Sequence, residues 1–120
     1  MRVLIVESKP ELAKLWTGHL ERQGAEVEHM KTEVEAIDWL TDNNVDIIVL
    51  DLVLDRGSAF AVADFASYCR PTARVIFVTN TSFFSDGSIF QHIPNACAFL
   101  PSATAPEDLA AVIDYYGVAQ

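Results

Sequence analysis

The sequence predicts a doubly wound α/β domain, in which helices cover both faces of a five-stranded parallel sheet. The main evidence is a regular alternation along the chain. Short apolar runs, typical of strands buried on both faces, are separated by segments whose apolar residues recur at helical spacing. Strands that alternate with helices favour a parallel sheet with right-handed crossovers. The length of 120 residues indicates one domain, residues 1–120, with a core of its own.

Five segments have the character of strands. The first, third and fourth are continuous apolar runs, whereas the second alternates apolar and polar residues. Between the fourth and fifth, the stretch 80–95 is ambiguous, because Gly87 and Pro94 leave room for a short helix at most. The expected strands, in chain order, are 3–6, 25–30, 47–50, 75–78 and 96–100.

Two helices are expected in the first half of the chain. One begins near Pro10, which suits a first helical turn, and ends at Gly24. The other opens at Thr32 and Glu35, which form a capping-box pattern, and is broken by the two asparagines at 43–44. The apolar residues at helical spacing are Leu12, Leu15, Trp16 and Leu20 in the first helix, and the second is expected to bury Val34, Ile37 and Leu40.

Two more helices are expected in the second half. The Gly-Ser pair at 57–58 introduces an Ala- and Phe-rich helix that runs to about Tyr68 and is stopped by Pro71. A second capping-box pattern, Thr104 and Glu107, opens the last helix. One face of that last helix is formed by Leu109, Val112, Ile113 and Tyr116.

The composition narrows the classes of partner. With 17 Asp and Glu against 8 Lys and Arg, the net charge is -9, and the basic residues are scattered. Nucleic acid is therefore not expected as a partner, because phosphate binding depends on clustered Lys and Arg. The acidity favours solubility, basic partners or a divalent metal ion. No apolar run is long enough to span a membrane and no signal peptide is recognisable, so a cytoplasmic location is expected.

Cysteine and histidine show no metal-binding pattern. Cys69 and Cys97 form no CxxC pair, and we expect two free, buried thiols. His19, His29 and His92 share no spacing typical of metal ligands. A histidine-based metal site is therefore not expected.

Polar residues follow several of the predicted strands directly. Glu7 and Ser8 follow the first strand, Asp51 ends the third, and Thr79 ends the fourth. In open α/β sheets, ligands bind beyond the carboxyl ends of the strands, so Glu7, Asp51 and Thr79 are expected to converge in one shallow pocket. A carboxylate that ends a buried apolar run is costly to desolvate unless it meets a cation or hydrogen-bond donors. This favours a functional role for Asp51 over simple capping of the strand.

The sequence resembles the receiver domain of bacterial response regulators over essentially the whole chain. The resemblance rests on four segments: VLIVESKPEL, DIIVLDLVLDRGSAF, VIFVTN and ACAFLPSATAPEDL. It implies a flavodoxin-like (CheY-like) fold, a three-layer α/β/α sandwich. It also implies that the aspartate ending the third strand, here Asp51, accepts a phosphoryl group from a phosphohistidine of a sensor histidine kinase or phosphotransfer protein.

The resemblance further implies a Mg²⁺ site beside the phosphoacceptor. The family's acidic pair falls on Glu7 and Ser8, and its backbone carbonyl ligand falls on Val53, so that with Asp51 these four make up the expected ligand set. Mg²⁺ prefers hard oxygen ligands, and carboxylates above hydroxyls. Because Ser8 stands where the family has a second carboxylate, weak Mg²⁺ binding is expected. Asp55 is an alternative source of that carboxylate.

The residues that would respond to phosphorylation fall near the ends of the last two strands. By resemblance, Thr79 is the switch hydroxyl and Phe99 the switch aromatic, although Phe99 suits plain core packing equally well. Ser102 replaces the family's lysine, which removes a charge-assisted contact to the phosphoryl group worth roughly 1.5–3 kcal/mol. Lys9 and Arg56, on neighbouring loops, are either substitutes for that lysine or solvated surface cations.

Two functional interpretations stay open. In the first, the chain is a stand-alone, non-enzymatic receiver of a two-component phosphorelay that acts on a downstream protein effector. In the second, it is a degenerate receiver that binds partners without phosphorylation, and the adjacent Phe83 and Phe84 suit such an interface. The sequence leaves homodimerisation open. An unrelated flavodoxin-like enzyme or nucleotide binder is disfavoured, because no G-x-G-x-x-G, P-loop or catalytic Cys/His pairing is present.

Overall fold

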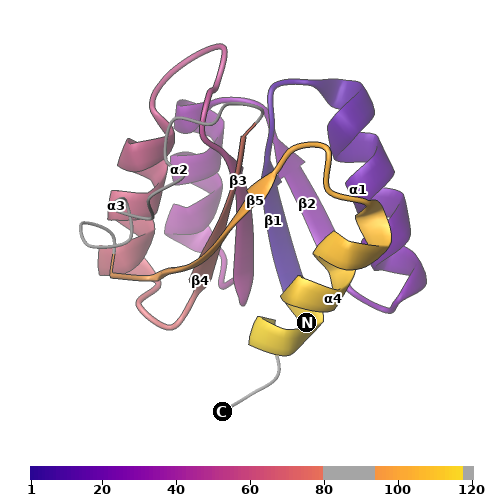
Figure 1. The fold of residues 1–120 in the computed structure, drawn as a ribbon. Helices are drawn as coiled ribbons and strands as arrows, with labels where there is room; N and C mark the ends of the chain where they lie inside the picture. The colour runs from indigo at the N-terminus through magenta and orange to yellow at the C-terminus, as the bar shows by residue number, and fades with distance from the viewer. Residues whose placement is uncertain (80–93, 118–120) are drawn as a thin grey trace.

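Five parallel strands form one sheet, with helices packed on both of its faces, in the computed structural model of the chain (Figure 1). The structure describes residues 1–79 and 94–117. The elements in chain order are β1 (Arg2–Val6), α1 (Pro10–Arg22), β2 (Glu26–Met30), α2 (Glu33–Asp42), β3 (Ile47–Asp51), α3 (Ala59–Cys69), β4 (Arg74–Thr79), β5 (Ala96–Pro101) and α4 (Pro106–Gly117).

The strand order is β2-β1-β3-β4-β5. The chain first moves outward from β1 to β2, then crosses to the other side of β1 and continues through β3, β4 and β5. The order therefore reverses between β1 and β3, as expected of a doubly wound sheet. The predicted fold class and all five predicted strands are confirmed. The ambiguous stretch 80–95 lies almost wholly outside the described residues, as do Phe83, Phe84 and His92.

Side chains on the central strands divide between two cores because successive residues of a strand point to opposite faces. On β1, Leu4 and Val6 pack towards α2 and α3, whereas Val3 and Ile5 pack towards α1 and α4. Figure 1 shows these two helix pairs on opposite sides of the sheet. All five residues of β3 are buried in the same way. Burial on both faces explains the continuous apolar runs in the sequence.

The helices bury somewhat different residues from those predicted. Leu15 and Val34 are exposed by 53% and 76%. Trp16, Leu20 and Leu40 are buried as predicted, and Ala13 and Ala36 complete the buried sides of α1 and α2. Two residues span about 200° of a helix, so placing an alanine against the sheet turns the residue two positions earlier, or later, towards solvent. On α4, the predicted residues Leu109, Val112, Ile113 and Tyr116 all pack into the core.

The capping box predicted at Thr32 and Glu35 forms in part, because the Glu35 carboxylate accepts from the Lys31 backbone N–H at 2.9 Å, one residue before Thr32. Thr32 Oγ1 accepts a hydrogen bond from the Glu35 backbone N–H at 3.2 Å, and α2 begins at the next residue after Thr32. The prediction at Thr104 is wrong, because the Ala105 carbonyl accepts from the backbone N–H of Leu109 and α4 begins only at Pro106. A proline has no N–H to satisfy, so it suits the first helical position better than an interior one.

Both cysteines are free thiols, as predicted. Cys69 is exposed at the last position of α3, contrary to the expectation that it is buried, whereas Cys97 on β5 is half-buried. Burial raises the pKa of the Cys97 thiol to about 11. A thiol with so high a pKa carries little thiolate at neutral pH, so Cys97 acts as a small apolar residue.

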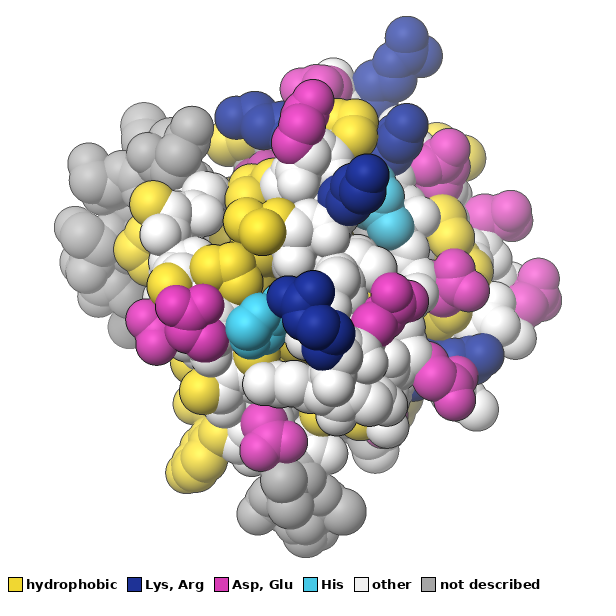
Figure 2. All heavy atoms as spheres, turned by 90° about the vertical axis from the view of Figure 1, so that its right-hand side faces the viewer, with side chains coloured by type: hydrophobic (Ala, Val, Ile, Leu, Met, Phe, Trp, Pro, Cys, Tyr) yellow, Lys and Arg dark blue, Asp and Glu magenta, His cyan; other side chains and the backbone are white. Residues whose placement is uncertain are grey.

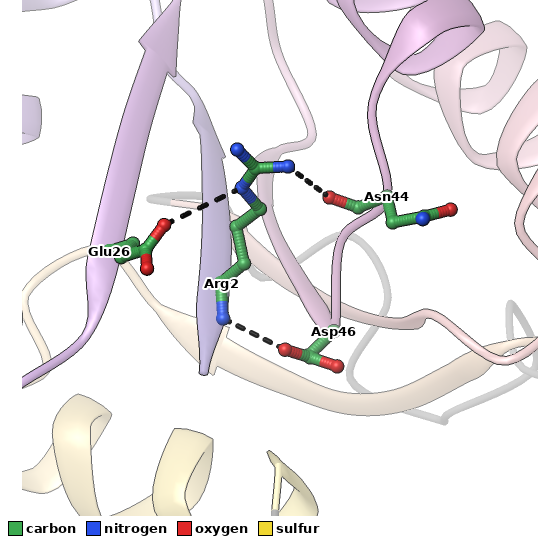
Figure 3. A network of polar contacts seen from close by, with 4 residues as sticks. All are labelled: Arg2, Glu26, Asn44 and Asp46. Carbon is green, nitrogen blue, oxygen red and sulfur yellow. Dashed lines mark hydrogen bonds and ion pairs between the residues drawn. The ribbon is translucent and has the colours of Figure 1, made fainter.

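Arg2 joins segments that begin three neighbouring strands (Figure 3). Its backbone N–H donates to Asp46 Oδ2 at 2.8 Å and its guanidinium donates to the Asn44 carbonyl at 3.3 Å. Its Nε lies 3.8 Å from Glu26 Oε2, and its guanidinium carbon lies 5.6 Å from the centre of the Trp39 ring. These contacts hold the amino-terminal edge of the sheet together, opposite the edge where the predicted site lies.

The surface over α1 and α4 is drawn in Figure 2, where Asp and Glu side chains gather on the right of the view. No helix in the described ranges is long and apolar enough to cross a bilayer.

Candidate functional site

Three polar side chains are buried at the carboxyl ends of adjacent strands. Glu7 follows β1, Asp51 ends β3, and Thr79 ends β4. Their exposed fractions are 0%, 8% and 1%, and they are the buried polar side chains of the described residues. Asp51 pairs with Val78 across the sheet, so Thr79 is the next residue along the neighbouring strand. The structure thus brings together the three residues expected to converge.

The carboxyl groups of Glu7 and Asp51 interact directly. Burial raises the pKa of Glu7 to about 8, and a hydrogen bond with Asp51 and the charge of Asp51 contribute to the rise. The backbone N–H and the charge of Lys9 act in the opposite direction. Glu7 Oε1 is buried, and no donor group in the described ranges forms a hydrogen bond to it. Two such carboxyl groups are stable together when they share a proton or a cation.

The edge strand β2 fixes the backbone of Glu7. The Glu7 N–H donates to the Met30 carbonyl at 3.0 Å, and its own carbonyl lies 2.7 Å from His29 Nε2. The Lys9 N–H donates to Glu7 Oε2 at 3.1 Å, so the oxygen without a donor among the described residues is Oε1. His29 was not among the predicted site residues. Its alternating strand segment gives no motif that would have indicated this contact.

Asp51 is oriented by the loop that follows it. The backbone N–H of Val53 donates to Asp51 Oδ1 at 3.0 Å, while the N–H of Leu52 donates to the Val78 carbonyl at 2.8 Å. The chain therefore turns back over the carboxylate immediately after β3. Val53 is exposed by 60%, so the predicted ligand residue lies at the open side of the site.

Ser8 connects three loops at the site. Its hydroxyl donates to the Lys31 carbonyl at 3.0 Å and accepts from the Asp55 backbone N–H at 2.9 Å. Lys31 follows β2 and Asp55 follows β3, so one side chain ties the loops after β1, β2 and β3. The donor capacity of the hydroxyl is used by the Lys31 carbonyl. The Asp55 side chain is exposed, and its predicted part in metal binding stays a prediction.

A second connection joins the same loop to α2. Glu33 Oε1 accepts from the Ser58 N–H at 2.6 Å, and the Glu33 N–H donates to the Arg56 carbonyl at 3.3 Å. Gly57 lies between Arg56 and Ser58 with a φ of 95°, and a Cβ there would meet the Glu33 side chain. The close approach requires a glycine. Sequence reasoning missed Glu33, because its partners lie on a distant loop.

The last predicted site residues lie on or beside β5. The backbone N–H of Ser102 donates to the Thr79 carbonyl at 2.8 Å, which places Ser102 beside Thr79 at the site. Phe99 pairs with Phe77 across β4 and β5 and packs against the core beneath α2 and α3. The packing agrees with the plain core interpretation of Phe99, and its switch role stays a prediction.

The residues present fit a hard divalent cation. Two carboxylates are present, one of them with an oxygen that meets no donor from residues 1–79 or 94–117, and carboxylates are the ligand type that Mg²⁺ takes. Within the described ranges, no group of three or more His, Cys, Asp or Glu side chains is arranged to hold a metal ion. Further ligands would therefore have to come from backbone carbonyls or water. Mg²⁺ commonly keeps several water ligands, so this set is sparse but adequate.

A separate cavity of about 550 Å³ lies at the opposite end of the sheet. Its lining includes Asp46, Arg74 and Tyr116, and the Arg74 guanidinium carbon lies 5.9 Å from the centre of the Tyr116 ring. None of the predicted site residues lines it. The candidate site is therefore the strand-end cluster, which holds the buried carboxylates.

The chain belongs to the response regulator receiver domain family, whose model matches residues 3–111. Among solved structures, a non-phosphorylated HemR receiver domain from Leptospira biflexa is 24% identical, with a TM-score of 0.87 over 99% of this chain and 95% of that one. A CheY-like receiver domain protein from Methanospirillum hungatei is 22% identical, with a TM-score of 0.88 over 97% and 92%. The comparison with curated proteins finds no match.

A third structure bears on the metal. The response regulator TrrA from Thermotoga maritima, in complex with Mg²⁺ and BeF, is 20% identical, with a TM-score of 0.83 over 96% of this chain and 97% of that one. These structural likenesses establish the receiver fold. Membership of the family rests on the family model.

Proposed function

We propose that this receiver domain is a phosphorylation-controlled switch with Asp51 as its phosphoacceptor. The observation that carries the proposal is the buried pair of Glu7 and Asp51 at the point where the strand order reverses. An Asp51 oxygen attacks the phosphorus of a phosphohistidine, the P–N bond breaks, and the imidazole departs with the electron pair and takes up a proton. The product is an acyl phosphate on Asp51.

Glu7, Asp51 and the Val53 carbonyl would hold Mg²⁺ in this site. When bound, the cation would neutralise the negative charge of the carboxylates and the incoming phosphoryl group. The Val53 N–H orients the Asp51 carboxylate through a hydrogen bond, and the charge of Lys9 acts to lower the pKa of Glu7. Ser8 would contribute little to metal binding, because its hydroxyl hydrogen-bonds Lys31 and Asp55. These features support weak Mg²⁺ binding.

Thr79 and Phe99 would transmit the change. Thr79 lies beside Asp51 on β4, and its carbonyl is bonded to Ser102 at the end of β5. A phosphoryl group on Asp51 that draws the Thr79 hydroxyl towards it would shift β5, which carries Phe99. The signal would pass from a sensor histidine kinase or phosphotransfer protein to a downstream protein effector. We propose a non-enzymatic role, and a cytoplasmic location stays a prediction.

A second candidate function is a phosphorylation-independent interaction module. Two observations favour it. Ser8 ties the loops around Asp51 together without phosphorylation, and Ser102 gives the phosphoryl group no cationic partner at the family's lysine position. In this case the same fold would present one fixed surface to its partners.

Amide NMR with beryllofluoride, a phosphoryl mimic, tests the two against each other. Mg²⁺ is added first, then the mimic, and the Asp51→Asn protein is the control. Saturable shifts at Val53, Thr79 and Ser102 that are absent from the control support the switch. No shift at saturating mimic contradicts it and favours the fixed module.

A further inference from the structure

The outer edge of β2 is unpaired in the described part of the chain. β2 is the terminal strand of the sheet, with β1 as its neighbour. The Glu26 N–H donates to the Met1 carbonyl, and the Met30 carbonyl accepts from the Glu7 N–H. Glu26 and Met30 therefore direct their backbone groups towards β1. Alternate residues of a parallel strand face opposite neighbours. Val27 and His29 therefore direct their N–H and C=O groups away from the sheet.

A groove lies between the carboxyl end of β2 and α2. It has a volume of about 530 Å³, and we refer to it as the β2 groove. One wall is formed by His29, Met30 and Lys31. The other is a single stripe of α2, because residues three, four and seven apart share a helix face. That stripe consists of Glu35, Asp38, Trp39 and Asp42.

The β2 groove is acidic. Exposed carboxylates from Glu35, Asp38 and Asp42 line it, and Lys31 is the lining residue with a cationic side chain. Glu28 is also exposed on β2 itself, whereas the exposed Glu26 carboxylate lies 3.8 Å from Arg2 Nε. The aromatic ring of Trp39, which also lines the groove, has the Arg2 guanidinium carbon 5.6 Å from its centre, so one cation is already held there.

We propose that the outer edge of β2 binds an extended, Lys- or Arg-bearing segment of a partner protein as an added strand. Val27 and His29 would pair with its backbone. Its cationic side chains on one face would meet the carboxylates of α2. A sheet edge and an acidic wall side by side favour a basic polypeptide, since the edge selects an extended backbone and the wall selects its charge. The proposal does not depend on phosphorylation of Asp51.

A second copy of this chain is a poorer occupant. Pairing two β2 edges would bring Glu26 and Glu28 of one copy against those of the other, in a chain with a net charge of -9. Like charges opposite one another destabilise paired strands, and proteins use charged edge residues to prevent such pairing. The same charges attract a basic segment.

Peptide titrations of the full ¹⁵N-labelled chain test the proposal. The probe is a synthetic peptide of about eight residues that alternates Lys and Thr, a length typical of a strand. A Glu-Thr peptide of the same length is the charge control. Two further Lys-Thr peptides carry N-methyl groups, one on all lysine amides and the other on all threonine amides. Each lacks the hydrogen-bond donors of one edge.

The expected result is saturable shifts of the Val27 and His29 amides and the Trp39 indole with the Lys-Thr peptide. The Glu-Thr peptide should cause none, and only one of the two N-methylated peptides should bind. Asp38→Asn combined with Asp42→Asn should weaken binding roughly fivefold or more, because it removes the charge of the α2 wall. The matched control, Glu11→Gln with Asp64→Asn, changes the net charge equally on α1 and α3 and should leave binding intact.

Several results would overturn the proposal. Equal weakening by both double variants would mean attraction to net charge alone. Equal binding of both N-methylated peptides would exclude strand addition. Shifts elsewhere on the chain, or no saturable shift at all, would show that the β2 groove is not the binding site.

Discussion

The carboxyl groups of Glu7 and Asp51 interact at the carboxyl ends of β1 and β3, the neighbouring parallel strands between which the strand order reverses. Their burial makes a doubly ionised pair unfavourable, and the pKa of Glu7 accordingly rises to about 8. The repulsion between the two carboxylates is relieved by a proton on one of them, by a bound divalent cation, or by substitution of either residue with a neutral one. The free energy of unfolding should therefore respond to pH and to any cation or phosphoryl group bound at this site.

The first prediction concerns pH. In the absence of divalent cations, Glu7 should make the free energy of unfolding fall as the pH rises from 4.5 towards about 8. Its folded-state pKa is raised above the unfolded value of 4.5, so over this window the folded chain retains a proton that the unfolded chain has lost. Urea denaturation in chelator at several pH values measures the slope. Glu7→Gln should remove this contribution, and an unchanged slope in that variant would contradict the assignment.

Ser8→Ala should lower the free energy of unfolding by about 1–2 kcal/mol, because two hydrogen bonds at a partly exposed position are lost. It should also loosen the loop after β3. Urea denaturation gives the first effect, and hydrogen exchange of the Asp55 amide, which donates to Ser8 Oγ, gives the second. Unchanged protection of that amide would show that Ser8 does not hold the loop.

Ser8→Asp should tighten Mg²⁺ binding by about tenfold, since a carboxylate is a better ligand for a hard cation than a hydroxyl. Calorimetric titration with Mg²⁺ measures the change. Ser8→Asn, which has a similar shape without the charge, is the control. An equal gain in both variants would mean that shape rather than charge limits binding in the native site.

Gly57→Ala should destabilise the chain more than Gly24→Ala. Both glycines have positive φ, 95° and 94°, so an alanine at either costs about 1 kcal/mol in backbone strain. Only at Gly57 would the added Cβ also meet Glu33, whereas nothing lies within 4 Å at Gly24. That overlap should add about 1–3 kcal/mol. Equal losses of stability in urea denaturation would show that Glu33 moves aside freely.

Ser102→Lys should increase the amount of phosphorylated Asp51 formed with acetyl phosphate. A cationic partner for the phosphoryl oxygens is worth roughly 1.5–3 kcal/mol. Intact-protein mass spectrometry measures the labelled fraction, and Ser102→Met, of similar length without charge, is the control. If the lysine variant is labelled no better than the methionine variant, then Lys9 or Arg56 already provides the charge or the site is not phosphorylated.

Most of the fold could be predicted because β1, β3 and β4 are covered on both faces, which leaves apolar runs that are easily recognised. The location of the candidate site, at the carboxyl ends of the strands, then followed from the rule for ligand binding in open α/β sheets. The helix residues that face the sheet were harder to predict. Leu15 and Val34 are apolar enough to be buried, but Ala13 and Ala36 pack against the sheet and leave them exposed.

The connections around the site could not be predicted in the same way. The Ser8–Asp55 and Glu33–Ser58 hydrogen bonds join residues far apart in the chain, and neither forms a local motif. From the sequence, Ser8 is notable because it stands where the family has a second carboxylate. Its part as a link between loops depends on where the loops after β2 and β3 lie, which only the assembled sheet determines.

The position of β1 has a consequence for biosynthesis. It is made before β2 and β3, the two strands that flank it in the sheet. Val3 pairs with Ile47, so a nascent chain exposes one side of β1 until β3 has left the ribosome. Native contacts of this long range slow folding and leave apolar surface open meanwhile. The strand that anchors Glu7 is thus among the segments most in need of protection during synthesis.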